Sequence, residues 1–306
     1  MSVPVRFARG AAAARGPSAR RRRVEPVFYF FLLPTLVLFT ALVTAPAAVG
    51  IFYSFTDYVG FGDWSFTGLT NYVALFSDPS VLSAYEFTIG LALVTVVVAQ
   101  VAALALAIGL TGRIRFRAAL RTVFVIPMVI SGIVVAYVFS YLFSNTLPSV
   151  AGALGLHPLE QSVLGNPHLA WVAIALVSAW QTIPGALLIY IAGLLSIPGE
   201  LYEAAALDGA SAWRRFRSVT LPLISGFVLI NTVLGLKGYL NAFDVIVALT
   251  DGGPGTSTTS VAMAIFTGYT GGDYAYQMAD ATVFFVLTVV VSLLQLMATR
   301  GRGLRL

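Results

Sequence analysis

The sequence predicts an all-α polytopic membrane protein with six transmembrane helices. Of its 306 residues, 58% are hydrophobic and only 10% are charged, whereas a soluble domain carries about 25% charged residues. The mean hydropathy is +0.88. Several apolar runs are long enough to cross roughly 30 Å of hydrocarbon, and the basic residues gather in alternate connections between them.

Each apolar run is expected to be helical, because lipid offers no hydrogen-bond partner to an open backbone. The six runs lie at residues 27–55, 85–110, 118–143, 168–195, 221–249 and 277–298.

The arginines predict the orientation of these spans. Seventeen of the 18 basic residues are arginines, and they fall in four segments, 1–26, 113–121, 214–217 and 300–305. The opposite connections, 56–84, 144–167 and 250–276, contain no basic residue. By the positive-inside rule, both termini are cytoplasmic.

The same pattern divides the chain into a basic, disordered N-terminus (1–26), a membrane domain (27–298) and a basic cytoplasmic tail (299–306). The N-terminal arginines suit an anionic lipid surface. A cleavable signal peptide is the alternative, since Ala45-Pro46-Ala47 resembles a cleavage site. The apolar run continues to residue 55, however, and cleavage would leave an odd number of spans.

Composition excludes several kinds of chemistry. Without cysteine, the chain has no disulfide, catalytic thiol or cysteine-ligated metal. His157 and His168 are isolated, so no metal site is expected. A phosphate-binding loop needs Gly-Lys followed by Ser or Thr, and the one lysine, Lys237, lies between Leu236 and Gly238. We expect no catalytic residues, and the net charge of +5 reports topology rather than nucleic-acid binding.

Residues 197–222 are too polar to span and predict two short cytoplasmic helices joined by a turn at Gly209. On physical grounds alone, this segment could be an amphipathic loop on lipid headgroups. Its pattern, Glu203-Ala204-Ala205, then Asp208-Gly209-Ala210, then residues 216–222, resembles the "EAA" signature of binding-protein-dependent ABC importer permeases.

Two external loops extend the resemblance over nearly the whole chain from residue 27. "FTGLTNYVALF" (66–76) is similar to the family's first external loop, and "LTDGGPGTST" (249–258) to that of carbohydrate permeases of the maltose-transporter type. The GGP loop and the lack of a family-typical C-terminal tail indicate a MalF-like subunit.

The resemblance implies a non-catalytic subunit of a sugar importer in the bacterial inner membrane. Its partners would be a MalG-like permease, an external solute-binding protein and an ATPase dimer that binds ATP and magnesium; none is a nucleic acid, and this chain holds no cofactor. Residues 203–210 would form a coupling helix seated in the ATPase. Glu203 would face a basic residue of the ATPase, and Gly209 would form the turn, with Ala204, Ala205, Asp208 and Ala210 completing the motif.

Charged residues inside predicted spans are candidates for function. Lys237 and Asp244 are seven residues apart, and Asp280 lies near the outer end of the sixth span. We expect a structural charge pair of Lys237 with Asp244 or Asp280; a substrate role for Lys237 stays open.

Polar groups in the fourth and fifth spans predict a sugar site, because sugars need hydroxyl and amide partners. Resemblance to the maltose permease places the lining at Ser178, Gln181 and Thr182 and, in the next span, at Tyr239 and Asn241, with Asp244 nearby. Each could instead bond between helices, and Ser131 and Asn231 are weaker candidates.

The main alternative is a self-sufficient carrier or channel, since polar groups in broken spans also serve those proteins. No internal repeat is evident, and the cytoplasmic helix-turn-helix would have no purpose there. A membrane-embedded enzyme is disfavoured because no span pairs two catalytic groups. Relatives carry maltose-like oligosaccharides, trehalose or glycerol phosphate esters, so the particular sugar stays open.

Overall fold

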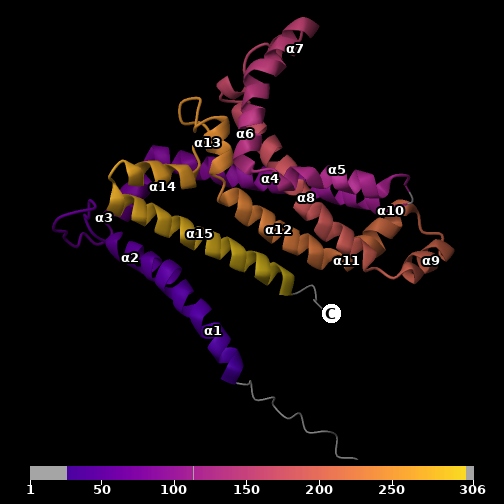
Figure 1. Ribbon diagram of the computed structural model, residues 1–306, viewed down its shortest axis with the longest axis horizontal. Helices are drawn as coiled ribbons and strands as arrows, with labels where there is room; N and C mark the ends of the chain where they lie inside the picture. Colours follow the sequence, from indigo (N-terminus) through magenta and orange to yellow (C-terminus); the bar gives the residue numbers. More distant parts are fainter. Residues whose placement is uncertain (1–25, 113, 301–306) are drawn as a thin grey trace, which may run out of the picture. The chain divides into compact units, whose positions relative to one another are not determined.

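The computed structural model describes residues 26–112 and 114–300 (Figure 1). The chain divides into two units, one ending at Val49 and one beginning at Gly50. The predicted disordered N-terminus, apart from Pro26, and the end of the basic tail lie outside the described residues.

The first unit contains one apolar helical run. Helix α1 (Pro26–Phe39) is followed by a π-helical turn (Thr40–Thr44) and by α2 (Ala45–Tyr53), which continues into the second unit. Together they form an apolar helical stretch of 25 residues, Tyr29–Tyr53, which confirms the first predicted span.

The second unit is helical throughout its described part apart from connecting loops and an isolated bridge between Thr56 and Phe66. Its helices are α3 (Thr70–Ser77), α4 (Pro79–Thr111), α5 (Arg117–Val129), α6 (Gly132–Tyr141), α7 (Leu147–Leu154), α8 (Ala170–Leu195), α9 (Gly199–Leu207), α10 (Ala212–Arg215), α11 (Leu221–Leu223), α12 (Ser225–Leu240), α13 (Asp244–Leu249), α14 (Val261–Thr270) and α15 (Tyr274–Arg300).

Five helical runs of the described chain are long and apolar enough to cross a membrane, and the number becomes six if one bent pair is a single span. The second, fourth and sixth predicted spans correspond to α4, α8 and α15. The bent pair joins residues up to Leu223 to α12 at an angle of 68°. The predicted count of six agrees with the higher of these two numbers, in which the fifth span is bent.

Two spans predicted as continuous helices are broken, which corrects the sequence interpretation. Ile130 and Ser131 are extended, with ψ angles of 136° and 132°, so residues 118–143 form α5 and α6, and the membrane-length run is Gly132–Leu154. The fifth span stops at Leu240 and resumes at Asp244. Both breaks fall inside predicted spans. Ser131 lies at the first break and Asn241 and Asp244 lie at the second, but these polar residues are too few to end the apolar runs.

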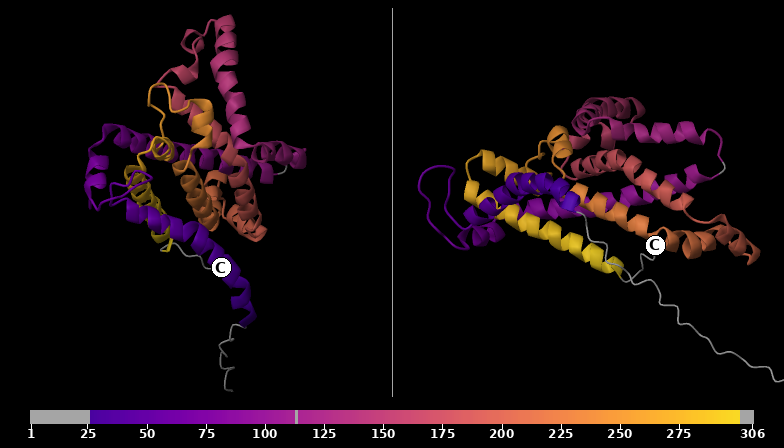
Figure 2. Two further views of the ribbon diagram at one scale, coloured as in Figure 1. Left: turned by 60° about the vertical axis from the view of Figure 1, so that its left-hand side comes forward. Right: turned by 60° about the horizontal axis from the view of Figure 1, so that its bottom comes forward.

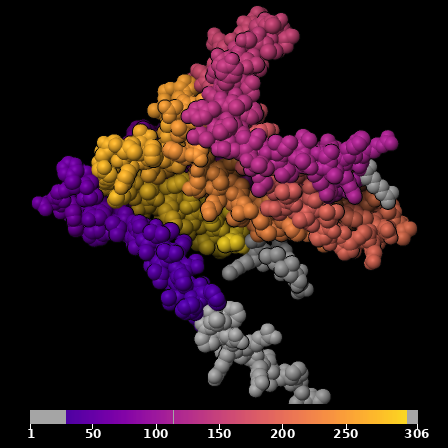
Figure 3. Space-filling view, in the orientation of Figure 1, coloured from indigo at the N-terminus to yellow at the C-terminus, as the bar shows by residue number. Residues whose placement is uncertain are grey.

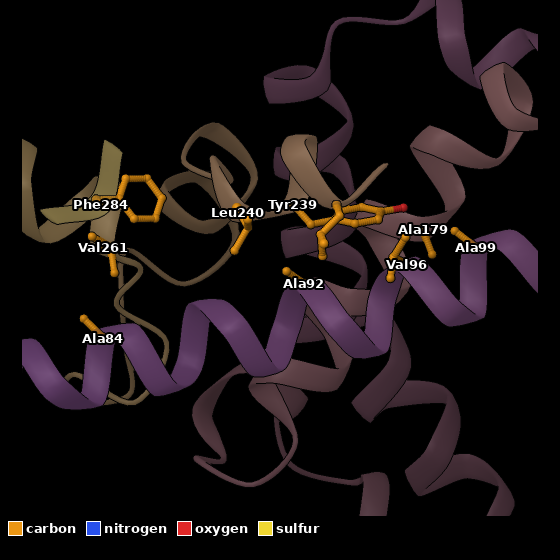
Figure 4. Packing of buried hydrophobic residues seen from close by; sticks show 10 residues of the cluster. Ala84, Ala92, Val96, Ala99, Ala179, Tyr239, Leu240, Val261 and Phe284 are labelled. Atoms are coloured by element: carbon orange, nitrogen blue, oxygen red, sulfur yellow. The ribbon is translucent and has the colours of Figure 1, made fainter. Parts of the chain in front are cut away.

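The core of the second unit forms where α8 and α12 pack on α4 and α15 packs on α12 (Figures 1 and 2). The contact face of α4 contains several alanines, of which Ala92, Ala103 and Ala107 are fully buried. Small side chains let helix backbones approach closely in a membrane. Figure 4 shows a cluster of buried hydrophobic residues at this contact, with Tyr239 of α12 directed toward α4.

Side-chain hydrogen bonds also join these helices. The Tyr190 hydroxyl of α8 donates to Gln100 Oε1 of α4 at 2.5 Å, and Asn231 Nδ2 of α12 donates to the Ala186 carbonyl of α8 at 3.1 Å. Such bonds hold helices together in lipid, where apolar surfaces gain little from meeting each other. Asn231, a weaker candidate for solute binding, therefore has a structural role.

The two ends of the second unit carry different segments. Helices α9 and α10 lie at the same end as the α4–α5 connection, whereas α3 and α14 lie at the opposite end (Figures 1 and 2). The arginines of the α4–α5 region and of α10 thus share one end, as the predicted topology requires. The α6–α7 segment projects from the body (Figure 3).

Candidate functional site

The segment after α8 folds as two short helices joined by a glycine turn. Helix α9 ends at Leu207, and Gly209 has a φ of +72°, a conformation that glycine adopts without steric cost. The Gly209 amide donates to the Ala206 carbonyl and the Ala210 amide donates to the Ala205 carbonyl, both at 3.0 Å. This pair of bonds is the Schellman arrangement that satisfies the last carbonyls of a helix. The structure confirms the predicted turn.

The second short helix begins directly after the turn. Ser211 Oγ accepts a hydrogen bond from the Arg214 amide at 3.3 Å and so caps α10. The segment then continues through a π-helical turn, Phe216–Thr220, into α11. The Tyr202 hydroxyl of α9 contacts Thr220 Oγ1 at 2.9 Å, which ties the first short helix to the base of the next span.

Much of this segment is exposed to solvent. Four of the six predicted coupling residues, Glu203, Ala204, Asp208 and Gly209, are exposed, while Ala205 and Ala210 are half-buried. Leu207 is 91% exposed and Trp213 is 69% exposed. Large apolar side chains beside a carboxylate at a protein's end are typical of an interaction surface.

The predicted polar lining of α8 lies between the two helix breaks. Thr182 Oγ1 hydrogen-bonds to the Tyr239 hydroxyl, close to the end of α12. A Cβ atom added to Gly132, the first residue of α6, would lie 3.4 Å from Gln181 Nε2. Helix α13 packs on both α6 and α8. Interrupted membrane helices commonly line solute paths, because their backbone can face a water-filled cavity.

The other predicted lining residues take different positions. Ser178 is 5% exposed, and its hydroxyl has no hydrogen-bond partner among the described residues. Asn241 and Asp244 are exposed at the two sides of the second break, where Asn241 Nδ2 donates to the Lys237 carbonyl at 2.9 Å. The structure thus joins Thr182 to Tyr239, buries the Ser178 hydroxyl without a partner, and leaves Asn241 and Asp244 exposed.

The end opposite α9 and α10 is acidic and well ordered. The hydroxyl of Ser65 donates to Asp57 at 2.5 Å and its amide at 2.6 Å, and these bonds lower the pKa of Asp57. Ser80 does the same for Asp78, with its hydroxyl at 2.7 Å and its amide at 2.8 Å. Both carboxylates are therefore charged at neutral pH.

Comparison with known proteins decides the family. Residues 101–301 match the family described as the binding-protein-dependent transport system inner membrane component. The chain belongs to this family. It is a permease component of the inner membrane with several membrane-spanning helices.

Relatives and solved structures agree with this assignment. The permease is 36% identical to a multiple sugar-binding transport system permease protein, MsmF, of Streptococcus mutans, over 87% of this chain and 92% of the relative. It is 34% identical to the trehalose/maltose transport system permease protein MalF of Thermococcus litoralis, over 93% and 97% of the two chains. A bacterial ABC transporter that imports the acidic polysaccharide alginate shares the fold, with a TM-score of 0.77, 23% identity and coverage of 90% and 95%.

The permease does not contain the predicted charge pair. Lys237 and Asp244 are both exposed, and the one ion pair among the described side chains joins His157 to Glu160. The break after Leu240 ends the helical repeat that would have placed Lys237 and Asp244 on one face. Asp280 instead accepts a hydrogen bond from the Tyr85 hydroxyl at 2.7 Å.

Replacement of Lys237 by methionine is expected to lower the stability of the permease by no more than about 1 kcal/mol. No ion pair is broken, and the favourable contribution of a cation in the last turn of α12 is about 0.3–1 kcal/mol. Thermal unfolding of the purified chain measures the change. A loss of several kcal/mol that Asp244→Asn restores would reinstate the predicted pair.

Sequence reasoning missed the polar residues that join the helices of the permease. Gln100 and Tyr85 both lie in α4, and each bonds to a residue on another helix. A glutamine in the middle of an apolar run is unusual, so the sequence alone could have indicated that Gln100 bonds to another helix. Tyr85 gave no such signal, because tyrosine is ordinary at the end of a span.

Proposed function

We propose that this chain is the transmembrane subunit of an ATP-driven importer that moves a sugar inward by alternating access. Family membership and the similarity to sugar permeases along nearly the full chain support the transport role. The observation that carries the coupling role is the exposed segment of two short helices, α9 and α10, joined by the turn at Gly209. This segment lies at the end of the second unit that carries the arginines.

Coupling follows from the geometry of this segment. The exposed carboxylate of Glu203 would accept a charge-assisted hydrogen bond from a basic residue of a separate ATPase subunit. Leu207 and Trp213 would enter an apolar part of the same cleft. Because Tyr202 ties α9 to the start of the fifth span, movement of the ATPase would be transmitted to α11 and α12.

The assembly would contain four kinds of partner. A MalG-like permease would complete the pathway, a dimeric ATPase would bind ATP and magnesium, and a solute-binding protein would dock at the acidic outer end. Lipid surrounds the rest. The outer end carries Asp57, Asp78 and Asp251 without a basic residue, so a docking surface of opposite charge fits it. In this arrangement the chain is MalF-like, holds no cofactor, and has both termini in the cytoplasm.

A sugar fits the polar groups beside the two helix breaks. Gln181 supplies an amide, Thr182 and Tyr239 supply hydroxyls, and Trp180 supplies an aromatic face next to Phe139, with ring centroids 5.4 Å apart. Sugars offer hydroxyls to the first groups and a flat apolar face to the last. A di- or oligosaccharide fits best, given the names of the sugar-transporting relatives.

Uptake by reconstituted vesicles tests the proposal. We expect labelled trehalose or maltose to accumulate only when the chain is reconstituted with a second permease, the ATPase, a binding protein and ATP. The chain alone should move neither sugar, and it should copurify with a second, different permease and two ATPase copies. Solute movement by the chain alone would instead support the carrier or channel alternative, and a functional homodimer would contradict the MalF-like assignment.

A further inference from the structure

A buried aspartate joins the outer ends of two spans without a positive partner. Asp280 of α15 is 1% exposed. Its Oδ1 accepts a hydrogen bond from the Tyr85 hydroxyl of α4 at 2.7 Å. Its Oδ2 is buried and has no hydrogen-bond partner among the described residues. No described lysine, arginine or histidine side chain lies within 4.0 Å of this carboxyl group.

The charged and titratable neighbours of Asp280 do not compensate a negative charge. From α4 these are Tyr85 and the N-cap residue Asp78. Asp78 Oδ2 accepts a hydrogen bond from the Tyr276 hydroxyl of α15 at 3.2 Å. Between α14 and α15, the ring of Tyr269 packs on Tyr274, and neither side chain carries a positive charge. The one charged residue of the neighbouring end of α12 is Lys237, which is exposed and in no ion pair.

A second buried acceptor lies on the same face of α15. Gln277 is three residues before Asp280, a spacing that makes helical side chains neighbours. It is 8% exposed, and its Oε1 is also buried without a described partner. Its side chain lies directly against Gly268 of α14, where an added Cβ atom would overlap the Gln277 amide.

We propose that Asp280 is a proton-binding site, whose buried carboxyl group carries a proton on Oδ2 in this conformation, while the bond from Tyr85 to Oδ1 joins α15 to α4. An ionised carboxylate with one hydrogen bond is far more costly to bury than a neutral carboxyl group. Protonation removes the charge and turns Oδ2 into a donor. Gln277 Oε1, three residues away on the same helix, is likewise a buried acceptor without a described donor. Tyr85 continues to donate to Oδ1.

The proposal has a consequence for stability as pH changes. A solvated aspartate ionises near pH 3.9, so above that pH the unfolded chain has released a proton that folded Asp280 keeps. The ratio of folded to unfolded chain therefore falls as pH rises, by up to about tenfold per pH unit. The fall ends when Asp280 of the folded chain also ionises. Asp280→Asn keeps the size and a donor but cannot titrate.

The experiment uses the full-length chain in lipid nanodiscs at about pH 5, where solvated aspartates are ionised. Infrared spectra should contain the carbonyl stretching band of a protonated carboxyl group that disappears in Asp280→Asn. The band should persist in Asp273→Asn, a control at an exposed carboxylate of the same outer end. Tyr85→Phe should keep the band at a higher frequency, because Oδ1 loses its donor. Thermal stability of Asp280→Asn should fall less with rising pH than that of the wild type.

Identical carboxyl bands and identical pH profiles in the wild type and Asp280→Asn would overturn the proposal. If Asp280→Asn does not fold, the Tyr85→Phe spectrum still decides, because an unchanged carboxyl region would mean that no proton resides at Asp280. Stability that depends on sodium concentration in the wild type but not in Asp280→Asn, with no carboxyl band, would assign a bound cation instead and contradict the proton.

Discussion

Replacement of Gly209 by valine is expected to reduce ATP-driven uptake at least roughly tenfold while leaving the permease inserted and folded. Gly209 has a φ of +72°, and a left-handed conformation costs a residue with a Cβ atom about 1–2 kcal/mol. The cost is greater still for a β-branched residue. Valine should therefore change the backbone conformation at residue 209 and so alter the orientation of α10 relative to α9. Uptake and ATPase retention, compared at equal permease levels in membranes, measure the effect.

The expected loss of uptake comes from backbone strain at Gly209 and not from steric overlap with neighbouring residues. An added Cβ atom at Gly209 would meet nothing within 4 Å in this chain, so the backbone conformation alone opposes valine. Gly209→Asn is the matched control, because asparagine tolerates the left-handed region. We expect Gly209→Asn to retain most of the uptake. Full uptake by Gly209→Val would show that the turn is not needed for coupling.

Replacement of Tyr239 by alanine is expected to destabilise the permease by roughly 2–5 kcal/mol. Tyr239 is 3% exposed, and its ring packs in the cluster formed with α4 and α8 (Figure 4). Truncation leaves a cavity that helices in lipid cannot readily close. The loss should lie toward the lower end of this range, because lipid removes much of the gain from apolar burial. Thermal unfolding in detergent measures it.

Tyr239→Phe separates the ring from the hydroxyl. Phenylalanine keeps the packing and removes the hydrogen bond to Thr182, a loss of about 0.5–1.5 kcal/mol. Thr182 Oγ1 retains the Ser178 carbonyl as a partner at 2.9 Å. If Tyr239→Ala were as stable as Tyr239→Phe, the ring would not be part of the core.

Hydropathy and arginine placement predicted the spans well, because both report directly on the lipid environment. Apolar runs located α4, α8 and α15 to within several residues. The glycine turn at Gly209 was also predictable, since a glycine between two short polar helices has few other uses. The sequence signals at the break after Ile130 are Pro127 and Ser131-Gly132. They do not decide the matter, because proline and glycine are tolerated inside membrane helices.

The candidate site was predicted less completely, because its contacts depend on those breaks. Pairing Lys237 with Asp244 assumed a continuous helix, and the helix ends at Leu240. The actual partner of Asp280 is Tyr85, which is 195 residues away in sequence. A contact over such a distance depends on how α4 and α15 pack, and a single sequence does not contain that information.

The affinity of the ATPase subunit for the permease tests the coupling role of the α9–α10 segment most directly. Glu203 and Glu200 are both exposed carboxylates on α9, so Glu200→Ala is the matched control for Glu203→Ala. Loss of a charge-assisted hydrogen bond of about 1.5–3 kcal/mol corresponds to a dissociation constant raised about 10- to 150-fold. We predict this change for Glu203→Ala and an unchanged constant for Glu200→Ala. Equal constants for both variants and the wild type would contradict the account.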